Sequence, residues 1–242
     1  MKVSIIIPVR NEVLAIEKII NQLENNLESL TYEIIFINDF SEDNTANEIN
    51  KKIKNKTHIK IYENQKKGLG GAIFEGINKS TGEAVCIMMS DLSDSIDDLK
   101  KYYDIIKNEK VDAVFGSRFI DGSKITDYPK KKLILNRIFN LFTKLLFISD
   151  YNDFTNAFKI YKKTALLNTF PLVSESFNIF LEMPLKIISR KMKYKIIPIN
   201  WRKREKGKAK FNIKELRSKY LFTLIYCFLE KNLLKKYLDR KH

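Results

Sequence analysis

Apolar and polar positions form two kinds of block along the first half of the chain. Short, almost unbroken apolar runs are typical of strands that are buried on both faces of a sheet. Five such runs are expected as strands, at residues 2–9, 32–37, 59–62, 84–89 and 111–116. Helical spacing is found between them, at residues 14–30, 45–54, 68–79 and 96–107. This order predicts an α/β fold with a mostly parallel sheet and helices on both faces.

The regular alternation stops after residue 118. We expect a loop over 121–129, a basic helix over 132–148, a strand over 158–161 and a helix over 177–191 that contains Pro184. A last strand over 195–201 and a basic loop over 202–210 precede a long amphipathic helix over 212–238, with a break near Glu230 and Lys231. The chain is therefore expected to form one α/β domain over 1–210 and a C-terminal helical extension over 211–242.

The strand expected at 84–89 ends abruptly in acidic residues. Asp91 and Asp94 follow at the point where this strand leaves the sheet. Ligands of open α/β sheets bind beyond the carboxyl ends of the strands, so Asp91 is the first candidate for a functional residue. The alternative is that Asp94 caps the next helix and Asp91 lies in a solvated turn.

The ends of the other expected strands carry further candidate residues, which a parallel sheet brings to one edge. The full set is Pro8, Asn11, Glu12, Asp39, Asp91, Ser117 and Arg118. Carboxylates beside a cation suit a phosphorylated ligand held by Mg²⁺ or Mn²⁺, because such a metal takes few protein ligands and completes its shell with water and phosphate oxygens. Asp39 could bind a ribose hydroxyl or a base edge, and Arg118 could neutralise a phosphate.

The glycines at 68–71 match neither of the common phosphate-binding motifs. The third glycine of a dinucleotide fingerprint is replaced by Ile73, and no Gly-Lys-Ser/Thr sequence of a P-loop occurs. We therefore expect Gly70 and Gly71 to permit a tight turn and close helix packing.

Positive charge is concentrated in two segments of this 242-residue chain, whose formal net charge is +15. Residues 129–163 hold 8 Lys/Arg against 2 Asp/Glu, and residues 201–242 hold 14 against 4. Such segments attract the phosphates of small ligands, anionic lipids or nucleic acids. A nucleic-acid partner is not expected, because the sequence lacks a recognition-helix pattern and interleaved aromatic residues.

Membrane-spanning and disulfide-rich classes are not expected either. No apolar run approaches the roughly 20 residues that cross a bilayer, and the first residues lack a signal-peptide pattern. Cys86 and Cys227 have neither metal-site spacing nor the pattern of a disulfide framework. We expect a soluble or peripheral protein of a reducing compartment.

Five motifs occur in an order and spacing that resemble the family 2 GT-A glycosyltransferases. They are Pro8–Glu12, Asn38–Thr45, Gly68–Ala72, Ser90–Ser93 and Gly116–Phe119. The resemblance is closest to the dolichol-phosphate mannosyltransferase-like branch, which acts on polyprenyl phosphates. It continues through Asp153–Lys159, Phe180–Met183 and Arg204–Lys210.

The resemblance implies a GT-A fold and an inverting transferase that uses a nucleotide-diphosphate sugar and a divalent metal, Mg²⁺ or Mn²⁺. The nucleotide sugar would be bound by Pro8, Asn11, Glu12, Asp39 and Asp91. The metal would be held by Asp91, with Ser93 or Asp94. The acceptor phosphate or donor diphosphate would be contacted by Arg118, Arg137, Arg204 and Lys210.

Several positions depart from the family pattern. Met89 replaces the first acid of the usual Asp-x-Asp, and a thioether is a poor ligand for a hard cation. Asn38 and Phe40 replace an acid and a glycine after the second strand. Lys159 and Ala209 are further changes, so the donor and acceptor could differ from those of the branch's best-known members.

The expected reaction is a single displacement at the anomeric carbon, with Asp91, Arg118 and Asp153 as catalytic candidates. A polyprenyl phosphate acceptor is already anionic and needs no general base. A hydroxyl acceptor on a lipopolysaccharide or capsule glycan would need one, and Asp153 is then the candidate. The alternative for Asp153 is a helix cap. A catalytically inactive GT-A binding module is the remaining alternative, supported by Met89.

The C-terminal helix places Leu216, Tyr220, Leu224 and Phe228 near one face, between basic flanks. This face could lie on an anionic membrane, at the cytoplasmic side, and bring a lipid acceptor to the site. The alternative is that the helix docks on the core or forms a homodimer interface.

Overall fold

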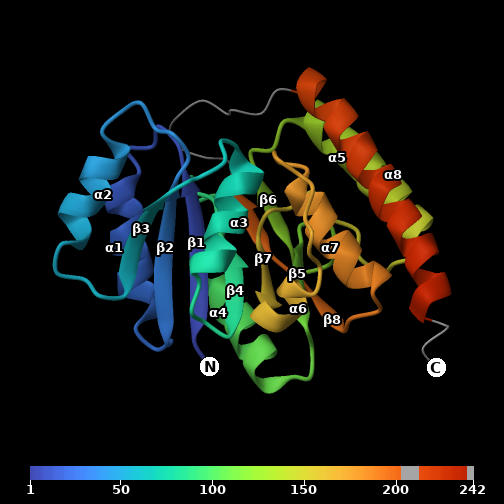
Figure 1. The fold of residues 1–242 in the computed structure, drawn as a ribbon, viewed down its shortest axis with the longest axis horizontal. Coiled ribbons are helices and arrows are strands. Elements are labelled where there is room, and N and C mark those ends of the chain that lie inside the picture. Colours follow the sequence, from blue (N-terminus) through green and yellow to red (C-terminus); the bar gives the residue numbers. More distant parts are fainter. Residues whose placement is uncertain (203–212, 239–242) are drawn as a thin grey trace.

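A central sheet of seven strands organises the computed structural model, which describes residues 1–202 and 213–238 (Figure 1). The strands in their order across the sheet are β3 (Ile59–Glu63), β2 (Tyr32–Asn38), β1 (Val3–Val9), β4 (Ala84–Ile87), β7 (Lys159–Lys162), β5 (Ala113–Ser117) and β8 (Tyr194–Pro198). All neighbours are parallel except β7, which is antiparallel to both β4 and β5. The predicted mostly parallel α/β sheet is confirmed.

Helices cover both faces because successive side chains of a strand point to opposite sides. The helices of the first half are α1 (Ile16–Leu27), α2 (Thr45–Ile53), α3 (Leu69–Lys79) and α4 (Ile96–Asn108). Ile5 and Ile7 of β1 belong to the core beneath α1, α2 and α4, whereas Ile6 belongs to the core beneath α3. All seven residues of β1 are buried, which explains its unbroken apolar run.

Strand β7 brings a later part of the chain to the functional edge of the sheet. Ile160 of β7 is paired with both Cys86 of β4 and Val114 of β5. Because β7 is antiparallel to these two strands, the segment that precedes it lies where they end. Residues 150–158 are thereby placed beside Ser117 and Arg118.

Three expectations for the second half are corrected by the structure. The strand expected over 195–201 is two strands, because the chain leaves the main sheet after Pro198 with Ile199 buried in the core. The second, β9 (Asn200–Arg202), pairs with β6 (Lys124–Thr126), which lies in the segment expected as a loop. A short helix, α6 (Lys163–Leu167), was also not expected.

The C-terminal helix α8 (Ile213–Leu238) is continuous, so the break expected near Glu230 and Lys231 is wrong. These polar residues are used in packing: Glu230 lies 2.7 Å from Arg190, which directly follows α7 (Ile179–Ser189), and Lys231 donates to the carbonyl of Phe147 at 2.8 Å. Phe147 ends α5 (Lys130–Phe147), so α8 packs against α7 and lies beside α5 (Figure 1).

Docking on the core, one of the alternatives for the C-terminal helix, is confirmed. Leu224 and Cys227 of α8 are buried against the domain, and Phe228 lies edge-to-face on Phe147 with ring centroids 6.2 Å apart. Within residues 1–202 and 213–238, no helix has the length and apolarity needed to cross a membrane.

Candidate active site

The turns after β1 and β2 are joined to each other at the edge of the sheet. The N–H of Asn11 donates to the Ser41 hydroxyl at 3.0 Å, and the N–H of Glu42 donates to the Asn11 side chain at 2.7 Å. Asn11 and Phe40 have φ values of 51° and 55°, in the left-handed region. Asn tolerates this region, but Phe does not favour it, which gives a physical reason for a glycine at position 40 in the family.

Asp39 lies at the base of this edge and is held by the glycine-containing turn before α3. Its Oδ1 accepts from the Asn64 amide at 2.7 Å and from the N–H of Gly68 at 2.8 Å. Both of these side-chain hydrogen bonds fall on one oxygen, so the other carboxylate oxygen is available to a ribose hydroxyl or a base N–H.

Asn38 is occupied within the sheet edge. Its amide donates to Glu63 Oε2 at 2.8 Å, and its carbonyl oxygen accepts from the N–H of Ser41 at 3.2 Å. An acid at position 38 would place two carboxylates in contact, which is unfavourable. The presence of Asn at this departure from the family pattern is therefore explained by Glu63.

Asp91 and Asp94 follow β4 as expected, in two different environments. Asp91 Oδ1 accepts from the N–H of Ser93 at 3.1 Å and from the Ser93 hydroxyl at 2.7 Å. Leu92, between these two residues, has a left-handed backbone with a φ of 54°. Asp94 is 7% exposed, and its Oδ2 has no hydrogen-bond partner within the described part of the chain. Burial and the neighbouring charge of Asp91 raise the pKa of Asp94 to about 7.

These oxygens suit a divalent metal whose coordination shell is completed by oxygens of the substrate. Asp91, the Ser93 hydroxyl and the unpartnered Asp94 Oδ2 are hard donors of the kind that Mg²⁺ and Mn²⁺ prefer. Met89 packs against the apolar core and supplies no such donor. In the described residues, no cluster of three or more His, Cys, Asp or Glu forms a complete protein cage. The site therefore fits a metal bound mainly through phosphates and water.

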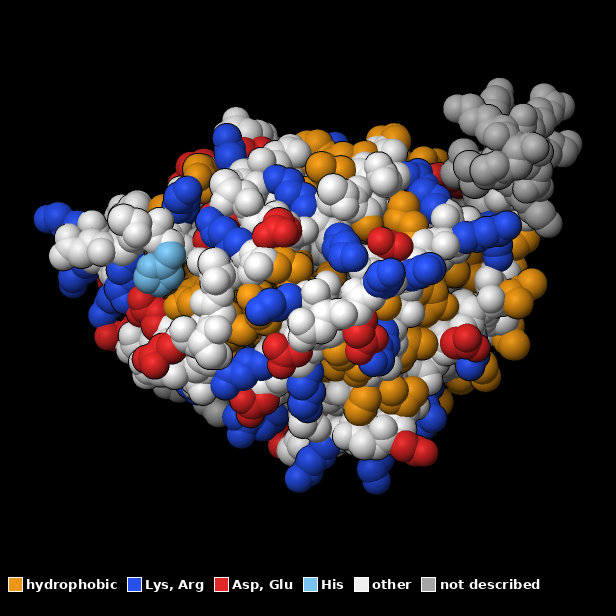
Figure 2. Space-filling model, turned by 90° about the horizontal axis from the view of Figure 1, so that it is seen from below, with side chains coloured by type: hydrophobic (Ala, Val, Ile, Leu, Met, Phe, Trp, Pro, Cys, Tyr) orange, Lys and Arg blue, Asp and Glu red, His pale blue; other side chains and the backbone are white. Residues whose placement is uncertain are grey.

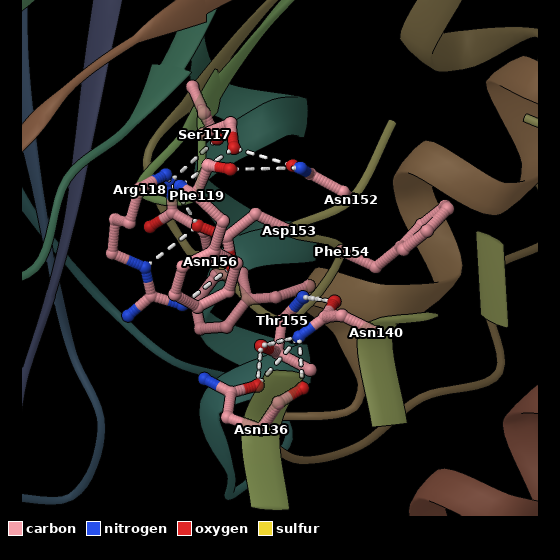
Figure 3. Close-up of polar contacts among 12 residues, drawn as sticks. Ser117, Arg118, Phe119, Asn136, Asn140, Asn152, Asp153, Phe154, Thr155 and Asn156 are labelled. Atoms are coloured by element: carbon pink, nitrogen blue, oxygen red, sulfur yellow. Dashed lines mark hydrogen bonds and ion pairs between the residues drawn. The ribbon is translucent and has the colours of Figure 1, made fainter. Parts of the chain in front are cut away.

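Arg118 and Asp153 form a two-pronged ion pair (Figure 3). Arg118 directly follows β5, and Asp153 lies in the segment that precedes β7. Arg118 Nε lies 2.8 Å from Asp153 Oδ2, and a terminal guanidinium nitrogen lies 2.7 Å from Oδ1. Asp153 Oδ2 also accepts from the N–H of Arg118 at 2.9 Å. Burial opposes the charge on Arg118, but the Asp153 carboxylate outweighs it and raises the pKa of Arg118.

Side chains from two elements, β5 and α5, fix the segment that carries Asp153. Ser117 donates to Asn152 at 2.6 Å, and Asn152 donates to the carbonyl of Phe119 at 3.2 Å. On the other side, the Thr155 hydroxyl donates to Asn136 of α5 at 2.7 Å and accepts from Asn140 at 3.1 Å (Figure 3). Helix α5 therefore holds the segment that carries Asp153, through Thr155.

Three cations gather around two aromatic rings beside this ion pair. The guanidinium carbons of Arg118 and Arg137 lie 5.3 and 5.6 Å from the centroid of Phe119. The guanidinium carbon of Arg118 also lies 5.7 Å from the centroid of the Tyr128 ring, and the Lys132 ammonium lies 5.9 Å from it. Burial and the charge of Arg118 lower the pKa of Lys132. Such a cluster is suited to an anion that relieves the repulsion among its cations.

Lys132 and Lys159 are residues whose role the sequence did not indicate. Lys132 was only one of several lysines at the start of a basic helix. Lys159 is buried in β7, where its ammonium donates to the carbonyls of Phe154 at 3.1 Å and of Asn156. Burial lowers its pKa to about 7, although Asp153 acts in the opposite direction. A lysine inside an apolar run was the one available signal for Lys159.

The candidate residues divide into three groups. Pro8 is buried in β1, and Glu12 follows that strand and donates its N–H to the Thr45 hydroxyl at 2.9 Å. Asn11, Asp39, Asp91, Arg118 and Arg137 lie at the same edge or beside it, as described above. Arg204 and Lys210 lie outside the described residues.

The profile of Glycosyl transferase family 2 matches residues 4–170, more than half of the chain. The chain belongs to this family. It is 31% identical over 138 residues to a dolichol-phosphate mannosyltransferase of Pyrococcus furiosus, covering 57% of this chain and 39% of that protein. It is 25% identical over 170 residues to the glycosyltransferase AglD of Haloferax volcanii, covering 68% and 27%. The chain thus spans well under half the length of these curated relatives.

The fold is also found in solved structures of low sequence identity. Glucosyl-3-phosphoglycerate synthase of Mycobacterium tuberculosis, with Mn²⁺, UDP and phosphoglyceric acid, matches with a TM-score of 0.72 and 14% identity, covering 94% of this chain and 78% of that one. The same protein with Mg²⁺ and UDP matches with a TM-score of 0.71 and 13% identity, covering 93% and 79%. The expected GT-A fold of this family 2 glycosyltransferase is confirmed.

Proposed function

We propose that this family 2 glycosyltransferase moves a sugar, with inversion, from a nucleotide-diphosphate sugar to a polyprenyl phosphate at the cytoplasmic surface of a membrane. The donor half of this proposal rests on Asp39 and Asp91. Asp39 presents a carboxylate oxygen to the nucleoside, and Asp91 lies where the diphosphate and its metal would be held. The acceptor half rests on the surface beside the Arg118 cluster.

The observation that carries the proposal is the exposed apolar surface formed by α5 and α8, called here the α5–α8 face. Its members are large apolar side chains that are half or more exposed: Ile134, Leu135, Ile138, Leu141, Phe142 and Leu145 of α5, Ile148, and Leu221, Phe222, Ile225, Leu229 and Leu233 of α8. Figure 2 shows hydrophobic side chains along the right-hand end of the molecule, the end to which α5 and α8 belong in Figure 1.

A lipid surface is the partner that best suits this face. So many exposed large apolar side chains on two neighbouring helices are unusual on a protein that is surrounded only by water. Helix α5 contains Lys130, Lys131, Lys132, Arg137 and Lys144 and no acidic residue, which suits anionic headgroups. The same helix bears Arg137 and Lys132 of the cation cluster. An acceptor with an apolar chain and a phosphate head would thus meet both surfaces at once.

The residues then have separate tasks in the reaction. Arg118, Arg137 and Lys132 bind the acceptor phosphate and turn one of its oxygens toward the sugar. Asp153 holds the Arg118 guanidinium in place and accepts three hydrogen bonds from that residue. A phosphate acceptor needs no general base, because its oxygen is already anionic. A bound divalent metal supplies charge stabilisation to the leaving diphosphate.

Donor binding provides the first test of this proposal. The full chain is heated with Mn²⁺ and each of a panel of UDP- and GDP-linked hexoses, and unfolding is followed by fluorescence. A ligand that binds only the folded state raises the midpoint temperature. At least one donor is expected to do so in the presence of metal. If no donor raises the midpoint, the protein is not a nucleotide-sugar transferase.

A further inference from the structure

A buried carboxylate of α7 supports the loop that precedes this helix. Glu182 is 0% exposed and lies in the Phe180–Met183 motif. Its two oxygens accept from the N–H of Val173 at 2.9 and 3.1 Å, and Oε2 also accepts from the N–H of Ser174 at 2.8 Å. Charged acceptors of backbone N–H groups fix a loop strongly, because breaking the contact would leave a buried charge unsatisfied.

The loop that Glu182 fixes is in direct contact with the turn that holds Asp39. The N–H of Gly70 donates to the carbonyl of Glu175 at 3.1 Å. The approach is so close that a Cβ at Gly70 would collide with the carbonyl of Ser174. Two residues before Gly70, the N–H of Gly68 donates to Asp39 Oδ1 at 2.8 Å. A continuous series of hydrogen bonds and backbone contacts therefore joins Glu182 to Asp39.

Helix α8 is attached to the same loop. The Thr223 hydroxyl, fully buried in α8, accepts from the Asn178 amide at 2.8 Å and lies 3.3 Å from the Ser174 hydroxyl. Lys186 lies 3.2 Å from both Glu182 and Glu230, so it bridges α7 and α8. The helix that contributes five of the twelve members of the α5–α8 face is thus bonded to the loop that supports the donor side of the site.

We infer that Glu182 is a positioning residue for donor binding. It fixes residues 173–175, whose backbone holds the Gly68–Gly71 turn against Asp39, and Thr223 connects α8 to the same support. Buried ion pairs contribute little net stability compared with apolar packing, and in some proteins they specify one arrangement of the groups around them. The Glu182–Lys186 pair has this task, because every partner of Glu182 belongs to the loop or to the bridge toward α8.

This inference rests on the proposed function, since it assigns the nucleoside to Asp39. Glu182→Gln tests it, because the amide keeps the shape and one acceptor but loses the charge and the second acceptor. Glu33→Gln is the matched control. Glu33 is likewise buried and accepts from a backbone N–H, that of Thr81, but it lies at the opposite end of β2 from Asp39.

The measurement is the dissociation constant of UDP and of GDP with Mn²⁺, by titration calorimetry on the full chain. Glu182→Gln is expected to weaken binding of the nucleotide that the unaltered protein binds by about tenfold, the loss expected for a charged hydrogen bond. Glu33→Gln is expected to leave the constant within about twofold, although it also lowers stability. In turnover assays, Glu182→Gln should raise the donor KM and change kcat little.

The outcomes separate the inference from the proposed function. If the unaltered protein binds neither nucleotide, the proposed function and the inference both fail. If it binds and Glu182→Gln binds equally well, the inference alone fails. If Glu182→Gln does not fold, Thr223→Val is measured in its place, because it keeps the packing volume while releasing the loop from α8. Unchanged donor binding in Thr223→Val would then overturn the inference.

Discussion

Asp153 holds Arg118 through both prongs of the guanidinium and also accepts the backbone N–H of the same arginine. The pair is almost completely buried, with Arg118 7% and Asp153 0% exposed. Each residue was a separate candidate in the sequence, one for a phosphate contact and one for a base. Their pairing gives them a joint task, in which the carboxylate orients the cation.

The first prediction concerns Asp153→Asn. Removing one partner of a buried pair leaves the other charge uncompensated, so unfolding should require about 3 kcal/mol less free energy. The acceptor KM should rise because Arg118 is no longer oriented. Urea unfolding and acceptor titrations measure the two effects. A stable variant with an unchanged acceptor KM and a kcat reduced several hundredfold would instead identify Asp153 as a general base.

The second prediction concerns acid stability at the opposite edge of the sheet. Hydrogen bonds from Ser4, Thr81 and Lys2 outweigh burial and lower the pKa of Glu33 from 4.5 to about 2. A lowered pKa in the folded state stabilises the protein above pH 4.5, and this contribution is lost as the pH falls toward 2. Unfolding free energies of the unaltered protein and of Glu33→Gln should differ by roughly 3 kcal/mol at pH 6, and the difference should shrink below pH 4.5 and be mostly lost at about pH 2. A difference that does not change with pH would contradict this account.

The third prediction concerns Met89. Because the thioether packs on the core and offers no hard donor, Met89→Asp should lower the Mn²⁺ concentration required for half-maximal activity, by about tenfold for an added carboxylate ligand. Metal titrations of activity measure this concentration. An unchanged value would mean that position 89 does not face the metal.

The fourth prediction concerns the α5–α8 face. Replacing Leu141 and Phe142 together by Glu should weaken binding to vesicles with anionic lipids by at least about tenfold, since two apolar contacts are lost and two negative charges are added. Vesicle co-sedimentation measures the binding. Leu167→Glu, on the exposed surface of α6, serves as the control and should bind normally. Equal binding by all three proteins would show that the face does not contact lipid.

The parallel half of the fold could be predicted from the sequence because its strands are continuous apolar runs and its helices have regular spacing. The insertion of β7 could not, because its partners Cys86 and Val114 lie far from Ile160 along the chain. The division between β8 and β9 was also hidden. Ile199 continues the apolar pattern, although the chain changes sheets at that point.

The candidate site was predicted as a set of residues but not as a set of contacts. Strand-end position alone indicated Asp39, Asp91 and Arg118. The Arg118–Asp153 pair depends on the antiparallel β7, and the cluster depends on the packing of α5, which brings Lys132 and Arg137 to the rings beside Arg118. Neither arrangement has a periodic signal in the sequence.

Sugar transfer to a lipid phosphate is the decisive measurement for the proposed function. The full chain is incubated with a radiolabelled donor that raises its unfolding midpoint, Mn²⁺, and vesicles containing polyprenyl phosphate, and the product is extracted into chloroform. We expect a labelled sugar lipid of inverted anomeric configuration, and at least about a hundredfold less with Asp91→Asn. Label that remains in water-soluble glycan or free sugar, or equal turnover by Asp91→Asn, would contradict this account.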